Sequence, residues 1–329
     1  VFACFAVITL HGAAGFVGGI SLTDTEYGNH NWWAGNIYDS ITRWCVPLFV
    51  MISGYFLLNK EEPLSIFINK RMSKLLIPLV FWSLFFTLWI VLKGTIKGEL
   101  SETPKTIAIA WLMGRPYYHL WFVYMIPFLY LSTPALRVIL KKFSRNEALF
   151  FIIFCFSLAI LNTLFTNILS FFELNSKVSL FTNSFLSYIG YFCLGGYIAK
   201  YNIKIKTNTA LFSLLLAWLI TIFGSYFFTY SYFYSYLSIN TVIASIALFL
   251  LIKKFFDKNL KLDSFAKLNF GIYLVHPVFL DAFTFLGKDR LLDNMSAYIY
   301  IPLVSVFVFL CSYGAVFFMS KLKFFNRCV

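Results

Sequence analysis

The chain has 329 residues, of which 60% are hydrophobic and 12% are charged, and its formal net charge is +13. Soluble domains are about 45–50% apolar and about 25% charged, so this composition excludes a water-soluble fold and indicates a protein embedded in lipid. The positive charge does not indicate nucleic-acid binding, because the basic residues form short clusters between apolar runs, where membrane topology places them.

Apolar runs long enough to cross a membrane, each of about 20 residues, recur along the whole chain. They predict an all-α polytopic membrane helix bundle with about ten transmembrane helices. The predicted spans are residues 1–20, 44–58, 75–92, 119–140, 148–172, 180–199, 208–229, 237–252, 268–286 and 297–319. No internal repeat or long linker interrupts them, so residues 1–329 are expected to form a single integral-membrane domain. The six cysteines are scattered without close pairing and are expected to be buried free thiols.

The distribution of Lys and Arg predicts the orientation of the chain. Ten spans place both termini on one side, and if that side is the cytoplasm, 19 of the 27 basic residues fall in inner segments. The other eight fall in outer segments. Because basic residues concentrate in cytoplasmic loops, this split predicts that both termini are cytoplasmic.

The first predicted span, residues 1–20, opens with VFACFAVITL. It has neither a basic n-region nor a small-residue cleavage site, so we expect a transmembrane helix whose cytoplasmic beginning is missing, rather than a signal peptide. His11 lies about 16 Å along this helix, near mid-membrane. It is a candidate base, because an imidazole exchanges protons near neutral pH and ionisable residues inside a bilayer are functional candidates. The alternative is a buried histidine that hydrogen-bonds a neighbouring helix.

The outer loop that follows, residues 21–43, holds His30 and the acids Asp24, Glu26 and Asp39. We expect these side chains to be solvated. The alternative for the acids is that one of them orients a catalytic imidazole.

The second predicted span contains the stretch VPLFVMISGYFLL, which Pro47, Ser53 and Gly54 interrupt. Small residues let helices approach closely, and a serine can form a hydrogen bond between helices. Helix packing therefore explains the stretch. Ser53 and Tyr55 are also candidate pocket residues.

A basic run, FINKRMSKLLIP, precedes the third span and carries Lys70, Arg71 and Lys74. Lys70 and Lys74 share one helix face, and Arg71 lies beside them. One interpretation is ordinary anchoring at the cytoplasmic surface. The other is a clamp for the phosphates of an anionic cytosolic ligand.

Two further histidines lie in aromatic stretches. His119 opens the fourth span in YYHLWFV at the outer interface, where Tyr117, Tyr118 and Trp121 suit an aromatic belt. His276 lies in FGIYLVHPVFLD, with Tyr273 one turn before it. Pro277 frees a carbonyl one turn back, so we expect a helix break that His276 would hold together. The alternative is that the two histidines, with Trp121 and Tyr273, line a pocket. No Walker loop, HExxH, GxSxG or metal-site spacing of Cys and His is present, so no metal is expected.

Four stretches, in this order, resemble the integral-membrane acyltransferase family of type 3, which includes bacterial surface-glycan O-acetyltransferases. They are the opening helix ending in VITLHG; VPLFVMISGYFLL with the following KRMSK and IPLVFW; YHLWFVYMIPFLYLSTPALR; and GIYLVHP. The second and third are most similar to the branch that acetylates enterobacterial common antigen. The resemblance covers the chain from end to end, although residues 141–265 add only hydropathy.

The resemblance implies roles for particular residues. Family members carry a catalytic histidine eleven positions after an arginine in the first helix; the histidine matches His11, and the arginine would immediately precede Val1. The family also carries two arginines, separated by two residues, before the third span. Arg71 and Lys74 match them, and Lys74 keeps the charge without the bidentate geometry of arginine. With Lys70, they are the expected acyl-donor-binding residues.

The resemblance further implies a membrane-bound O-acetyltransferase of the bacterial cytoplasmic (inner) membrane. It would move an acetyl group from cytosolic acetyl-CoA to a hydroxyl of a surface polysaccharide or lipid-linked sugar precursor. The expected partners are acetyl-CoA, this glycan acceptor and membrane lipids, with no nucleic acid and no permanently bound cofactor. A transporter or flippase for lipid-linked sugars, and a ligand-binding anchor or sensor, are the alternatives, because intramembrane histidines and a basic inner mouth would serve them too.

Overall fold

The computed structural model describes residues 1–98, 104–171, 184–228, 230–255, 263–292 and 295–329. Within these ranges the chain forms α-helices, one short 3-10 helix and no strand, which confirms the all-α fold. The helices are α1 (Phe2–Ala14), α2 (His30–Thr42), α3 (Cys45–Leu57), α4 (Leu64–Lys97), α5 (Pro104–Leu112), α6 (Trp121–Lys142), α7 (Arg145–Phe171), α8 (Ser184–Tyr201), α9 (Thr207–Phe227), α10 (Tyr230–Phe233), α11 (Ile239–Phe255), α12 (Asp263–Leu292), α13 (Ala297–Lys321) and the 3-10 helix η1 (Phe325–Arg327).

Seven stretches of the described chain are long and apolar enough to cross a membrane, which confirms a polytopic membrane bundle. They are His30–Leu57, Leu64–Ile96, Trp121–Lys142, Arg145–Leu169, Thr207–Phe227, Lys267–Phe285 and Ala297–Lys321. The helix α1 is apolar but shorter. Each of the ten predicted spans overlaps a helix, whereas the number of crossings and the side of the termini remain predictions.

Three of the described α-helices lie where the sequence predicted loops. α2 fills the second half of the predicted outer loop 21–43, α5 lies between the third and fourth predicted spans, and the short α10 lies between the seventh and eighth. α2 begins where the side chain of Asn29 accepts a hydrogen bond from the backbone N–H of Trp32, at 2.8 Å, which caps its first turn. The prediction of a loop is therefore wrong for residues 30–42, although the His30 side chain is exposed, as expected.

The helix α12 runs without interruption from Asp263 to Leu292, so the break predicted at Pro277 is absent. A proline inside a helix leaves the carbonyl four residues earlier without its helical donor. In α12 this carbonyl belongs to Tyr273, and the side chain of His276 bonds it. The replacement bond is consistent with the continuity of the helix.

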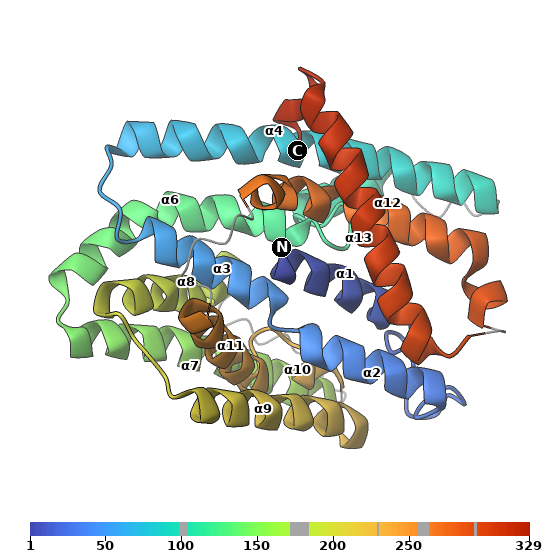
Figure 1. The fold of residues 1–329 in the computed structure, drawn as a ribbon, viewed down its shortest axis with the longest axis horizontal. Coiled ribbons are helices and arrows are strands. Elements are labelled where there is room, and N and C mark those ends of the chain that lie inside the picture. The colour runs from blue at the N-terminus through green and yellow to red at the C-terminus, as the bar shows by residue number, and fades with distance from the viewer. Residues whose placement is uncertain (99–103, 172–183, 229, 256–262, 293–294) are drawn as a thin grey trace.

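Most of the long helices run along one common direction, and α13 is inclined across them (Figure 1). α1 packs against α2, α3, α12 and α13, so four helices position the residues it carries. We call the end of the bundle where α3 ends and α4 begins the inner end. The outer end is where α4 ends and α6 begins, and both names follow the predicted topology.

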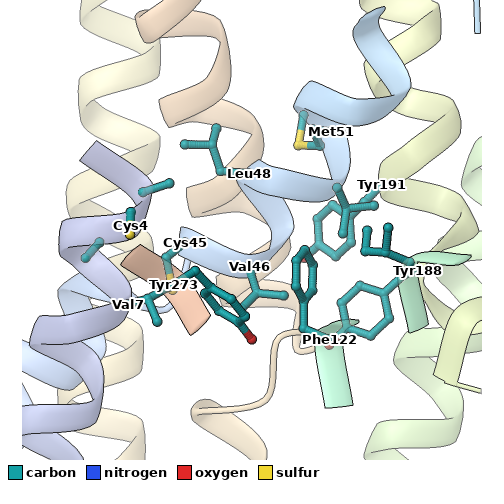
Figure 2. Close-up of a cluster of buried hydrophobic side chains, with 14 of the residues drawn as sticks. Cys4, Val7, Cys45, Val46, Leu48, Met51, Phe122, Tyr188, Tyr191 and Tyr273 are labelled. Atoms are coloured by element: carbon teal, nitrogen blue, oxygen red, sulfur yellow. The ribbon is translucent and has the colours of Figure 1, made fainter. Parts of the chain in front are cut away.

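The core packs tightly around α3. Figure 2 shows buried side chains from several helices around it, among them Cys45 and Met51 of α3 itself. A Cβ on Gly54 would lie 1.8 Å from the carbonyl oxygen of Phe192, and one on Gly195 would lie 2.0 Å from that of Met51. Only glycine permits this approach of α3 and α8, which confirms the packing interpretation of VPLFVMISGYFLL. All six cysteines are free thiols. Four of them are buried, as predicted, whereas Cys155 and Cys311 are half-buried.

Candidate active site

Three of the four histidines meet inside the bundle. The rings of His11 on α1 and His276 on α12 stack, with centroids 5.4 Å apart and planes inclined by 17°. His119, two residues before α6, meets the His276 ring edge-on at 5.4 Å. Across the described residues, no group of three His, Cys, Asp or Glu side chains is arranged to hold a metal ion. The structure thus joins three separately predicted residues into one site, which we call the histidine cluster.

Pro277 fixes the orientation of His276. Because proline has no N–H, the Tyr273 carbonyl lacks a helical donor, and Nδ1 of His276 lies 2.7 Å from its oxygen. A carbonyl oxygen only accepts, so Nδ1 carries the proton and Nε2 holds the lone pair of the neutral ring. This Nε2 is buried and has no hydrogen-bond partner among the described residues. The His–Pro pair therefore presents an unprotonated ring nitrogen to the protein interior.

His119 is held mainly through its backbone and by ring contacts. The hydroxyl of Tyr273 donates a hydrogen bond to the carbonyl oxygen of His119. The ring of Phe86 packs edge-on against the imidazole, with centroids 4.9 Å apart. Both ring nitrogens are buried, and neither makes a hydrogen bond of ordinary geometry with the described residues, although the backbone of Leu274 lies close enough to act on the ring. Burying such a group unbonded costs roughly 1–3 kcal/mol, so these nitrogens mark a place where a ligand would gain hydrogen bonds.

His11 is the member of the histidine cluster that faces a cavity. This His11 cavity, of about 410 Å³, is lined by His11, Gly12, Ala14, Gly15, Phe16, Tyr118, Leu280, Asp281, Thr284, Tyr300, Ile301 and Val304. His11 lies in the last turn of α1, and Tyr118 packs edge-on against its ring with centroids 4.8 Å apart. His11 can therefore touch a substrate held in this cavity.

A clamped carboxylate forms part of the same wall. Asp281, five residues after His276, accepts hydrogen bonds on Oδ2 from Nζ of Lys93 at 2.7 Å and from Nε1 of Trp89 at 2.8 Å. The hydroxyl of Tyr117 donates to the same oxygen. No described residue donates to Oδ1, and the Asp281 side chain is 20% exposed. The carboxylate is thus fixed by three donors and keeps one oxygen available.

A second cavity, the outer cavity, lies at the outer end beside the His11 cavity. Its volume is about 430 Å³, and it is lined by Thr87, Ile90, Lys93, Ile107, Ala110, Trp111, Arg115, Pro116, Tyr117, Tyr118 and Asp281. Tyr118 and Asp281 belong to the walls of both cavities. These two side chains therefore stand between the outer cavity and the histidine cluster.

Asp39 is buried, so the expectation that it is solvated is wrong. Its carboxylate accepts hydrogen bonds from Nε and from the Nη2 atom of Arg43, the second at 2.7 Å. The guanidinium carbon of Arg43 lies 4.6 Å from the ring centroid of Tyr234 and 5.7 Å from that of Tyr236. Arg43 is close enough to His11 to act on it electrostatically. Asp39 therefore holds a buried cation near the histidine cluster and orients no imidazole directly.

The predicted donor-binding residues face different ways. Lys70 and Lys74 are exposed on α4 near the inner end, whereas Arg71 is half-buried. Nε of Arg71 is buried and has no hydrogen-bond partner in the part of the chain that the structure describes. Arg71 also acts electrostatically on Tyr130 of α6 and on Glu62. Arg71 is thus directed into the bundle and the two lysines toward its surface.

A large cavity opens at the inner end, between the loop after α3 and the end of α6. Its volume is about 700 Å³. On its walls, Arg137 pairs with Glu62 at 3.3 Å and Lys141 with Glu61 at 2.8 Å. The hydrogen bond from Lys141 holds the pKa of Glu61 below its ordinary value. Because these cations already have carboxylate partners, the cavity presents mixed charge rather than a purely cationic surface.

Three predicted pocket residues, Ser53, Tyr55 and Trp121, do not line the His11 cavity. Tyr55 packs against Phe249 of α11, and Trp121 stacks on Tyr236, each with ring centroids 5.9 Å apart. The other three predicted pocket residues, His119, Tyr273 and His276, do join His11, through the ring contacts described above.

The polar residues of the predicted outer loop differ in their surroundings. Asp24 and Glu26 are exposed, as expected. His30 is the first residue of α2, and its Nε2 lies 2.7 Å from Oγ of Ser296 at the start of α13. His30 therefore links two helices at the outer end and is separate from the histidine cluster.

Several residues of this site were not predicted from the sequence. Asp281 lies within a predicted span, so the rule that selected the histidines, that ionisable residues inside a bilayer are functional candidates, applies to it equally. Asp39 and Arg43 are spaced i, i+4, which predicts an ion pair if the segment is helical. Tyr118 carries no comparable signal, because tyrosines are common at membrane interfaces.

Comparison with known families identifies the chain. The family profile described as an acyltransferase domain matches residues 1–317, a range that includes α1, α6 and α12 with the histidine cluster. No curated protein and no solved structure matches the chain. The chain therefore belongs to the type 3 acyltransferase family, whose members are enzymes of acyl transfer, and it is a multi-pass membrane protein.

Proposed function

We propose that this acyltransferase moves an acetyl group from cytosolic acetyl-CoA to a sugar hydroxyl. The sugar would belong to a bacterial surface polysaccharide or its lipid-linked precursor, and the enzyme would act in the bacterial cytoplasmic (inner) membrane. The observation that carries the proposal is the histidine cluster, in which His11 lines a 410 Å³ cavity next to a carboxylate with one available oxygen. Family membership supports acyl transfer, and the motifs shared with glycan O-acetyltransferases support a sugar acceptor.

The proposed reaction forms an ester bond and breaks a thioester bond. His11 takes the proton of the sugar hydroxyl, whose oxygen attacks the thioester carbonyl. The tetrahedral intermediate then expels the thiolate of coenzyme A. The proton held by His11 passes to this thiolate, so coenzyme A leaves as the thiol and the imidazole becomes neutral again. A positioned base of this kind contributes about 10²–10⁴-fold to the rate.

Arg43 is suited to stabilise the negative charge of the intermediate. It is a largely buried cation, 16% exposed, that Asp39 and two tyrosine rings fix in place. It lines a separate cavity rather than the His11 cavity, so its charge acts on His11 from a distance. A fixed positive charge in a site with little water stabilises a developing oxyanion more strongly than water does, because nothing has to reorganise during the reaction.

The inner end of α4 is suited to the phosphates of the donor. Arg71 precedes Phe86 by 15 residues on α4, or about 22 Å along a helix, and Phe86 touches the ring of His119. A separation of this order suits coenzyme A, whose long pantetheine arm lies between its phosphates and its thioester. Lys70 and Lys74 add positive charge at the same end.

Purified protein in lipid nanodiscs, radiolabelled acetyl-CoA and glycan extracted from the native membrane provide the test. The proposal predicts that label enters the glycan while an equal amount of coenzyme A appears as free thiol. A transporter or flippase would leave the coenzyme intact. Coenzyme consumption that does not depend on added glycan would contradict the sugar acceptor.

Mass analysis of surface glycans from cells with and without the gene then identifies the product. The expected difference is one acetyl group on one sugar of the repeat. A difference corresponding to another acyl chain would contradict the choice of acetyl-CoA as donor while leaving acyl transfer intact.

A further inference from the structure

The outer cavity has walls that suit a particular class of acceptor. We propose that it binds the acceptor through an anionic group, a phosphate or a carboxylate carried by the sugar, which the guanidinium of Arg115 engages. This inference rests on the proposed function and adds a charge requirement to it. It assigns the outer cavity to the acceptor and the outer end to acceptor entry.

The position of the cavity favours an acceptor over the donor. Tyr118 and Asp281 form walls of both the outer cavity and the His11 cavity. Tyr118 and Asp281 therefore lie between a sugar in the outer cavity and the cavity that His11 lines. The volume of about 430 Å³ lies in the usual range for small-molecule sites and suits one or two sugar rings.

The walls offer what a sugar ring needs. Trp111, Tyr117 and Tyr118 provide aromatic surface for the apolar faces of a ring. The indole of Trp111 is fixed, because its Nε1 donates to Oγ1 of Thr87 at 2.9 Å. Oδ1 of Asp281 accepts no hydrogen bond from the described residues, so it is available to a sugar hydroxyl. The three donors to Oδ2 hold the Asp281 carboxylate in place.

The balance of charge on the walls indicates an anionic ligand. Lys93 is neutralised by Asp281, to which its Nζ lies at 2.7 Å. Arg115 is exposed, and its guanidinium has no partner among the described residues, although it lines the same cavity. The described residues of the lining therefore carry one uncompensated positive charge. A planar guanidinium binds phosphate or carboxylate with two parallel hydrogen bonds, so Arg115 suits either anion.

Equilibrium binding of two matched pairs of sugars tests the inference. One pair is N-acetylglucosamine and its 1-phosphate, and the other is glucose and glucuronate, so the pairs separate phosphate from carboxylate. In at least one of the two pairs, the anionic sugar should bind purified wild-type protein at least about tenfold more tightly than its neutral counterpart, because one charge-assisted bidentate contact is added. The preference should weaken as salt screens the charge.

The Arg115→Gln variant should lose about tenfold in affinity for the anionic sugar and keep its affinity for the neutral one. Lys105→Gln is the matched control, because Lys105 is an exposed cation of the same outer segment that does not line the cavity. Unchanged binding in Arg115→Gln, equal affinity within both pairs, or no binding of any of the four sugars would overturn the inference. Transfer of label from acetyl-CoA is measured separately, so loss of the proposed activity with retained charge-dependent binding would be recognised as failure of the proposed function alone.

Discussion

Removing the carboxylate of Asp39 should destabilise the protein strongly, because it leaves a buried cation without its partner. The Asp39 side chain is 0% exposed and that of Arg43 is 16% exposed. Breaking one side of a buried ion pair typically costs about 3–5 kcal/mol, most of it from the uncompensated charge. Asp39→Ala should therefore lower the midpoint of thermal unfolding markedly. A thiol-reactive fluorophore can follow unfolding in detergent, since four of the six free cysteines are buried.

Two further variants make this test decisive. In Asp39→Ala/Arg43→Met the orphaned cation is gone, so most of the lost stability should return. Glu26→Ala removes an exposed acid of the preceding segment and should leave the midpoint unchanged. If Asp39→Ala unfolded at the wild-type midpoint, or if the double variant were less stable than either single variant, the account of a buried ion pair would be refuted.

Three other predictions concern the orientation of His276, the donor site and the topology. Pro277→Ala restores a backbone N–H that competes with His276 for the Tyr273 carbonyl. The protein should become more stable, while acetyl transfer falls roughly tenfold. Transfer at the wild-type rate would show that the His276–Tyr273 hydrogen bond does not position the ring. Arg71→Glu should weaken acetyl-CoA binding at low salt far more than at high salt. If neither the substitution nor the salt concentration changed binding, Arg71 would have only an anchoring role. In a background without native cysteines, Cys at Lys105 should react with an impermeant reagent in intact cells and Cys at Lys204 should not; similar labelling would refute the ten-span topology.

The helices were predictable from the sequence wherever contact with lipid requires a long run of apolar residues. A long apolar run has few alternatives to a helix in a membrane, so the predicted spans overlap helices throughout. The helix α2 was not predicted because its polar residues are directed inward. Asn36 is buried, and its Nδ2 donates to the carbonyl oxygen of Ile222 at 3.0 Å. A hydropathy scale counts such residues as solvent-seeking whether or not the fold supplies them with partners.

The individual site residues were also partly predictable, but their assembly was not. Intramembrane histidines are rare and costly, so His11 and His276 could be recognised from the sequence as functional candidates. Their stacking depends on the packing of α1 against α12, and no local pattern encodes that contact. The break expected at Pro277 illustrates the same limit, because the sequence shows the missing donor but not that a side chain replaces it.

The central claim is that His11 is the base of acyl transfer, and the most direct measurement compares His11→Gln with wild type. Glutamine keeps hydrogen-bonding capacity but has no useful basicity, so it separates chemistry from packing. Transfer of label from acetyl-CoA to glycan should fall about 10²–10⁴-fold, while acetyl-CoA binding and the unfolding midpoint stay at wild-type values. His30→Gln, which alters a histidine outside the histidine cluster, should retain full transfer. Transfer by His11→Gln at the wild-type rate, with the same coenzyme binding, would contradict the claim.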